Sequence, residues 1–81
     1  MSAENRQIIT QQLDLTGLAC PLPLLKMKLA LKQLEPEQLM YVVTTDSGSW
    51  ADFHKFAEMT NNELVSAKKV ADQYQFTIKK G

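Results

Sequence analysis

The chain has 81 residues, 44% of them hydrophobic and 22% charged, and its nine basic and nine acidic residues cancel at neutral pH. This length supports one small domain with a two-layer core, and the balanced charge gives no general attraction to nucleic acid or anionic lipid. One cysteine cannot form an internal disulfide, and the sequence shows neither a membrane-spanning apolar run nor a signal peptide. We therefore expect one cytoplasmic domain over residues 1–81, with residues 1–7 loosely ordered.

Changes in hydrophobic period along the chain predict six secondary-structure elements. In chain order these are a strand over 8–15, a helix over 20–34, a buried strand over 39–45, a helix from 49 to about 61, and strands over 63–70 and 73–80. Right-handed crossovers would place both helices on the same sheet face, and polar residues along the last hairpin favour an open second face. The expected fold is α+β, a two-layer α/β sandwich of order β-α-β-α-β-β with a mixed four-stranded sheet.

Cys20 lies in the tetrapeptide Cys20-Pro21-Leu22-Pro23 at the predicted start of the first helix. A residue that precedes proline favours extended geometry, so we expect Cys20 at the N-cap and Pro21 at the first helical position. The Leu22 N–H could then donate a hydrogen bond to the sulfur. Because a helix N-terminus favours a thiolate, the pattern predicts an accessible thiol with a lowered pKa.

The first predicted helix carries two apolar stripes. The stripe expected in the core comprises Leu24, Met27, Ala30, Leu31 and Leu34. A second stripe contains Leu22, Leu25 and Leu29. It either packs against the second helix or loops, or forms a rim where partners dock beside Cys20. Lys26 lies between the stripes, as a solvated charge or as part of a basic edge for an acidic partner surface.

The loop after the second predicted strand starts with Asp46. Two βα loops share one sheet edge, so we expect Asp46 near Cys20, as a turn residue or with a functional role. Ser49 and Asp52 resemble a capping box for the second helix.

The remaining chemistry-bearing side chains favour structural roles. The aromatic residues expected in the core are Trp50, Phe53 and Phe56, while His54 is expected at the surface. The sequence has no metal-ligand spacing, phosphate loop or catalytic triad, so we expect no metal and no cofactor.

The segment Gly17-Leu18-Ala19-Cys20-Pro21-Leu22-Pro23 resembles the TusA/SirA-like family of small sulfur carriers. The mark of that family is Cys-Pro-x-Pro at the start of a helix, after a strand and a Gly-containing loop, and the resemblance runs from about Leu13 to Lys80. It implies a two-layer sandwich in which Cys20 carries sulfur as a persulfide, supported by Gly17, Pro21 and Pro23. The sequence departs from the family habit at Leu22, often acidic in tRNA-thiolation carriers, and at Ser47, often proline.

The resemblance also implies partners. The donor would be a cysteine desulfurase or rhodanese-type protein, the acceptor a sulfur-relay protein, and the pathway tRNA thiolation or cofactor sulfuration. Neither a membrane nor direct nucleic-acid binding is expected. Because no second catalytic group is evident, the chain would be a sulfurtransferase-type carrier without a complete active site of its own. The alternatives are a regulatory or adaptor module whose cysteine is a redox sensor or structural, and an RNA-binding domain, which the zero net charge disfavours.

Overall fold

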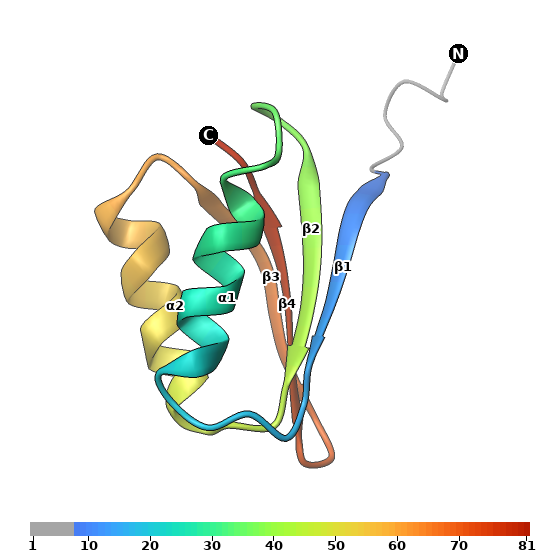
Figure 1. The fold of residues 1–81 in the computed structure, drawn as a ribbon, viewed down its shortest axis with the longest axis vertical. Helices are drawn as coiled ribbons and strands as arrows, with labels where there is room; N and C mark the ends of the chain where they lie inside the picture. Colours follow the sequence, from blue (N-terminus) through green and yellow to red (C-terminus); the bar gives the residue numbers. More distant parts are fainter. Residues whose placement is uncertain (1–7) are drawn as a thin grey trace.

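The computed structural model describes residues 8–81, so the expected loose segment 1–7 lies outside the described residues. The elements are β1 (Ile9–Leu15), α1 (Leu22–Leu31), β2 (Leu39–Thr44), α2 (Gly48–Met59), β3 (Glu63–Val70) and β4 (Gln73–Lys79). The strands form one sheet in the order β1-β2-β4-β3, with β1 and β2 parallel and the other neighbours antiparallel. Both helices cover one face of this sheet (Figure 1), and the predicted fold is confirmed.

The topology brings two βα loops to one edge of the sheet. Parallel pairing of β1 and β2 requires α1 to cross over the sheet between them. The register pairs the last residues of these strands, Leu15 with Thr44, so the loops that follow them start side by side. Figure 1 shows these loops leading together into α1 and α2. This edge is where the sequence places Cys20 and Asp46.

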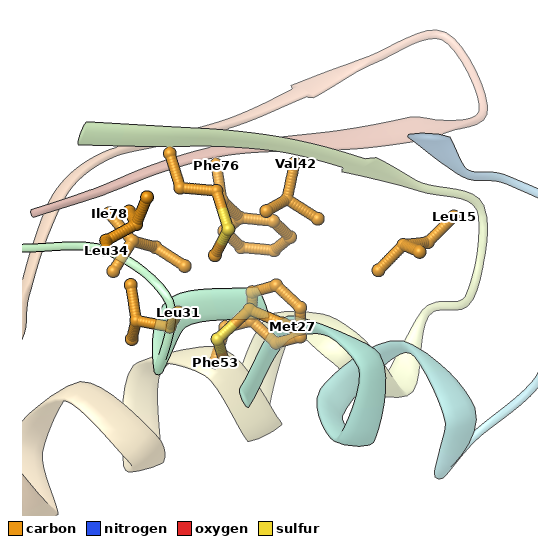
Figure 2. Close-up of a cluster of buried hydrophobic side chains, with 9 residues drawn as sticks. Leu15, Met27, Leu31, Leu34, Val42, Phe53, Phe76 and Ile78 are labelled. Carbon is orange, nitrogen blue, oxygen red and sulfur yellow. The ribbon is translucent and has the colours of Figure 1, made fainter. Parts of the chain in front are cut away.

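The core lies between the helical layer and the sheet, as Figure 2 shows. Phe53 of α2 meets Phe76 of β4 with 4.5 Å between ring centroids, and both rings are buried. Burial of one such side chain stabilises the fold by about 1.5–3 kcal/mol. The predicted core stripe of the first helix is confirmed. Its most buried members are Met27, Leu31 and Leu34, while Leu24 and Ala30 are partly buried against the same cluster.

The second sheet face carries the polar side chains of the hairpin. Phe76 and Ile78 of β4 point into the core, so their neighbours Gln75 and Thr77 point to the opposite face, where they are half-buried. This agrees with the expected open face. Within residues 8–81, no helix is long and apolar enough to cross a membrane.

Both helix starts differ from the prediction. Helix α1 begins at Leu22, with Pro21 rather than Cys20 as its N-cap. Helix α2 begins at Gly48 with Ser47 as its N-cap, so the predicted capping box is wrong and its two residues lie inside the helix.

Both helices also end earlier than predicted. Regular α-helix in α1 stops at Leu31, because the N–H groups of Gln33 and Leu34 donate to carbonyls three residues back, which makes a tighter last turn. Helix α2 stops at Met59, since the C-cap Thr60 has extended backbone.

Candidate functional site

Cys20 lies at the end of the β1–α1 loop, and its side chain is exposed to solvent. Its peptide bond to Pro21 is cis. Pro21 is the N-cap of α1, and Pro23 is buried in the first turn. The predicted accessibility of the thiol is confirmed, but its predicted N-cap position is wrong, because Cys20 precedes the cap by one residue.

The first turn of α1 offers the sulfur few backbone donors. Pro21 and Pro23 have no N–H group. The N–H of Leu22 donates to the carbonyl of Ala19, with 2.9 Å between nitrogen and oxygen, so the predicted bond to the sulfur is not formed. The prolines that fix this turn therefore remove donors through which a helix start usually stabilises an anion.

Two carboxylates from the second βα unit lie near the thiol. The thiol of Cys20 donates to Oδ2 of Asp52, with 3.6 Å between sulfur and oxygen. Asp46 lies in the β2–α2 loop, and its Oδ2 accepts a hydrogen bond from the Ser49 hydroxyl at 3.3 Å. A Cβ added at Gly48 would lie 3.2 Å from that Asp46 oxygen and 3.9 Å from the sulfur. The β2–α2 loop therefore lies beside Cys20, as expected.

The electrostatic surroundings raise the pKa of the Cys20 thiol above its ordinary value. Partial loss of hydration is the largest cause, followed by the negative charge of Asp52, its hydrogen bond with the thiol, and the charge of Asp46. Nearby carboxylates disfavour a further negative charge on the sulfur. The predicted lowering of this pKa is wrong, because it took account of the helix dipole alone.

The loop before Cys20 is fixed by a positive backbone angle and by polar contacts. Gly17 has a φ of +84°, which side-chain-bearing residues rarely adopt. Its N–H donates to Oγ1 of Thr45 at 2.9 Å, which ties the β1–α1 loop to the β2–α2 loop. Oδ1 of Asp14 accepts bonds from the hydroxyl and N–H of Thr16, and these bonds lower the pKa of the Asp14 carboxyl. Gly17 thus helps to hold the two loops together at the thiol.

The second apolar stripe of α1 is exposed. Leu22, Leu25 and Leu29, which we call the apolar rim, have exposed fractions of 44%, 47% and 62%. The alternative in which this stripe packs against the second helix or loops is therefore wrong. Lys26 is also exposed on α1.

A groove of about 330 Å³ runs between the two helices. We call it the interhelical groove, and its lining includes Leu24, Phe56 and Met59 together with Lys28, Asp52 and Lys55. Asp52 also contacts Cys20, so the groove is adjacent to the thiol.

The other predicted residues lie away from the thiol contacts. Phe53 is buried as expected, whereas Trp50 is 37% exposed, with its ring 4.8 Å from that of His54. Nδ1 of His54 lies 2.7 Å from the Trp50 carbonyl and donates its proton to it. In the described part of the chain, no three His, Cys, Asp or Glu side chains are grouped to hold a metal ion.

Asp52 is the site residue that the sequence argument missed. The capping-box pattern gave it a backbone partner at the start of the second helix. Its real position is one turn inside α2, on the side that meets the β1–α1 loop. A prediction that began the helix at Gly48 would have placed Asp52 one helical turn after that glycine, on the same side of the helix. That side faces the neighbouring loop.

Comparisons with known proteins identify the family of this chain. The model of the family described as Sulfurtransferase TusA matches residues 11–80. The sulfur carrier protein TusA of Allochromatium vinosum is 44% identical over 70 residues, which cover 86% of this chain and 92% of that protein. The sulfur carrier protein TusA of Pseudomonas fluorescens is 32% identical over 80 residues, or 99% of this chain and 96% of that protein. The chain therefore belongs to the TusA family of sulfurtransferases and sulfur carrier proteins.

Proposed function

We propose that this protein carries sulfane sulfur on Cys20, as a persulfide, from a donor protein to an acceptor protein. The observation that carries the proposal is the exposed thiol of the only cysteine, held in the Cys20-Pro21-Leu22-Pro23 turn of a TusA-family chain. Pro21 and Pro23 fix this turn, and Gly17 shapes the loop that leads into it.

The chemistry requires one thiolate from this chain. The Cys20 thiol first loses its proton to solvent. The resulting thiolate attacks the terminal sulfur of a donor persulfide, and a new sulfur–sulfur bond forms at Sγ. The sulfur–sulfur bond of the donor breaks, and its electron pair leaves with the donor thiolate. The acceptor repeats the exchange on Cys20. Electrons balance in each transfer, so no external oxidant or reductant takes part.

This scheme assigns a docking role to the residues around the thiol. Leu22 and Leu25 of the apolar rim, Lys26 on the same helix, and Asp46 in the facing loop would contact the partner while the sulfurs meet. Exposed leucines beside a reactive atom supply the apolar area that a protein interface needs. The donor would be a cysteine desulfurase or a rhodanese-type protein, and the acceptor a sulfur-relay protein of tRNA thiolation or cofactor sulfuration. A reducing cytoplasm suits a free thiol of this kind.

The chain would act as a stoichiometric carrier that depends on its partners for turnover. The exposed thiol and the family favour this function over an adaptor module whose cysteine is a sensor or structural, and over an RNA-binding domain.

Intact mass spectrometry tests the proposal directly. The reduced protein is incubated with a cysteine desulfurase and cysteine, and we expect a gain of one sulfur atom per chain. The gain should disappear after treatment with dithiothreitol, and Cys20→Ser should not show it. A wild-type chain that binds the desulfurase yet gains no sulfur would refute the carrier function and favour the adaptor.

A further inference from the structure

We propose that Asp52 is a positioning residue that holds Cys20 as a protonated thiol in the free carrier and disfavours small anionic reactants at the sulfur. The inference rests on the proposed function only in taking Cys20 as the atom that carries sulfur. It adds a second residue to the site and a preference about what the thiol reacts with.

The geometry singles out Asp52 from the other acidic side chains. Its Oδ2 lies 3.6 Å from Sγ, and the thiol is the donor. Asp52 lies one turn inside α2, so the backbone of a regular helix fixes its distance from the loop that bears the cysteine. Asp46 is also near, but its corresponding oxygen accepts the Ser49 hydroxyl and it lies in a loop. Asp52 is therefore the carboxylate that accepts the hydrogen bond of the thiol, and Asp46 acts on the thiol through its charge.

Two lysines share the interhelical groove with Asp52, and within residues 8–81 neither forms an ion pair with it. Lys28 of α1 and Lys55 of α2 line the interhelical groove together with Asp52. Within residues 8–81, ion pairs join Lys79 to Glu37 and to Glu63, and none of them includes Asp52. Lys28 instead faces the ring of Phe56, with its nitrogen 6.0 Å from the ring centroid.

A carboxylate in this position has two chemical consequences. It stabilises the protonated thiol by accepting its hydrogen bond, and only the thiolate is a good nucleophile. It also repels reactants that carry negative charge, such as thiosulfate or an anionic low-molecular-weight persulfide. A docked protein donor escapes this barrier because its interface holds the persulfide at the sulfur. The arrangement thus favours transfer from a bound protein over reaction with free anions.

The test compares alkylation of Cys20 by neutral iodoacetamide and by anionic iodoacetate in wild type and in Asp52→Asn. Asparagine keeps the size and the acceptor oxygen but removes the charge. The pH profile of the iodoacetamide rate should move to lower pH in the variant, with a rate increase of up to about tenfold at neutral pH, as one pKa unit corresponds to a tenfold change in the thiolate-to-thiol ratio. The ratio of the iodoacetate rate to the iodoacetamide rate should also rise.

Two controls separate this effect from net charge and from altered structure. Asp72→Asn removes the same charge at the exposed β3–β4 turn and should leave both the profile and the ratio as in wild type. Asp52→Glu restores the charge and should return the ratio toward the wild-type value. Equal melting temperatures would show that each variant is folded. The proposal would be overturned if folded Asp52→Asn had the pH profile and the iodoacetate-to-iodoacetamide ratio of wild type. It would also be overturned if Asp72→Asn shifted both by the same amount as Asp52→Asn.

A measurement on the unmodified protein keeps the proposal testable if Asp52→Asn does not fold. Salt screens the field of a partly exposed carboxylate, so raising the ionic strength should increase the iodoacetate-to-iodoacetamide ratio of wild type relative to that of 2-mercaptoethanol, a thiol without a carboxylate, under the same conditions. A ratio that follows 2-mercaptoethanol at every salt concentration would overturn the proposal. Sulfur loading by the desulfurase is a separate measurement, so its failure would refute the carrier function without bearing on the charge of Asp52.

Discussion

Cys20 lies two residues before the first residue of α1, next to two carboxylates and to a helix start that has lost two of its N–H groups to proline. A cysteine at a helix N-terminus is usually expected to ionise readily. Here Pro21 and Pro23 define the turn but donate nothing, and Leu22 uses its N–H within the backbone. Partial loss of hydration is therefore the largest cause of the raised pKa of Cys20, and the carboxylates of Asp52 and Asp46 act in the same direction. The rigidity of the motif and the acidity of its thiol are separate properties in this chain.

From the raised pKa of Cys20 we predict how the free energy of unfolding depends on pH. Because the folded chain binds the thiol proton more tightly than the unfolded chain, this stabilisation is present below the ordinary thiol pKa and is lost as pH rises through the folded value. We expect the free energy of unfolding of wild type to fall relative to that of Cys20→Ser between neutral pH and about pH 10. Urea unfolding of both proteins at each pH measures the difference between their free energies of unfolding. The contributions of the tyrosines and lysines cancel in this difference, because both proteins contain them. A difference that grows with pH would contradict the direction of the shift.

At the scale of the elements, α1 presents one face to the core and another to solvent. Met27 and Leu31 are buried against the sheet, while Leu25 and Leu29 of the apolar rim are about half exposed. Periodicity in the sequence separated these two stripes. It could not decide what covers the second stripe, because that depends on how far α2 lies from α1. In the structure, α2 leaves this stripe exposed to solvent.

The apolar rim gives a prediction about docking. Leu22 is 44% exposed in the first turn of α1, so Leu22→Gln should change the free energy of unfolding by no more than about 0.5 kcal/mol. It should slow sulfur transfer from the desulfurase, because it removes apolar area next to the thiol. Single-turnover transfer over a range of donor concentrations measures the effect, which should appear as weaker donor binding.

Two comparisons show whether a slower transfer comes from docking. Leu22→Glu also adds a charge that opposes ionisation of Cys20, so the uncharged glutamine variant isolates the loss of apolar contact. The alkylation profile of Leu22→Gln with iodoacetamide should match wild type. If Leu22→Gln transfers sulfur at the wild-type rate, Leu22 has no docking role. If Leu22→Gln does not fold, Leu22 belongs to the core.

At the scale of the whole molecule, the order of strands and helices follows from local patterns, whereas the surroundings of the thiol do not. The run Leu39–Thr44 was enough to place a buried strand, whereas the proline after Glu35 placed the end of the first helix at Leu34, three residues after the observed end at Leu31. The contact of Cys20 with Asp52 joins residues 32 positions apart, and it depends on a helix whose N-cap is Ser47, two residues before the predicted cap Ser49. Long-range electrostatics therefore had to come from the structure, while the two layers and the exposed thiol could be predicted.

The two-layer architecture gives a last prediction, on the contribution of α1 to the core. Met27 is fully buried between the layers, so Met27→Ala should lower the free energy of unfolding by about 2–5 kcal/mol through lost burial and the cavity left behind. A domain of this size is stable by only about 4–12 kcal/mol, so the loss would be large. Met27→Leu keeps most of the volume and should cost less than about 1.5 kcal/mol. Leu29→Ala, on the exposed side of the same helix, should stay within about 0.5 kcal/mol of wild type. Urea unfolding measures all three variants, and equal losses for Met27→Ala and Leu29→Ala would mean that α1 does not anchor the helical layer through its buried face.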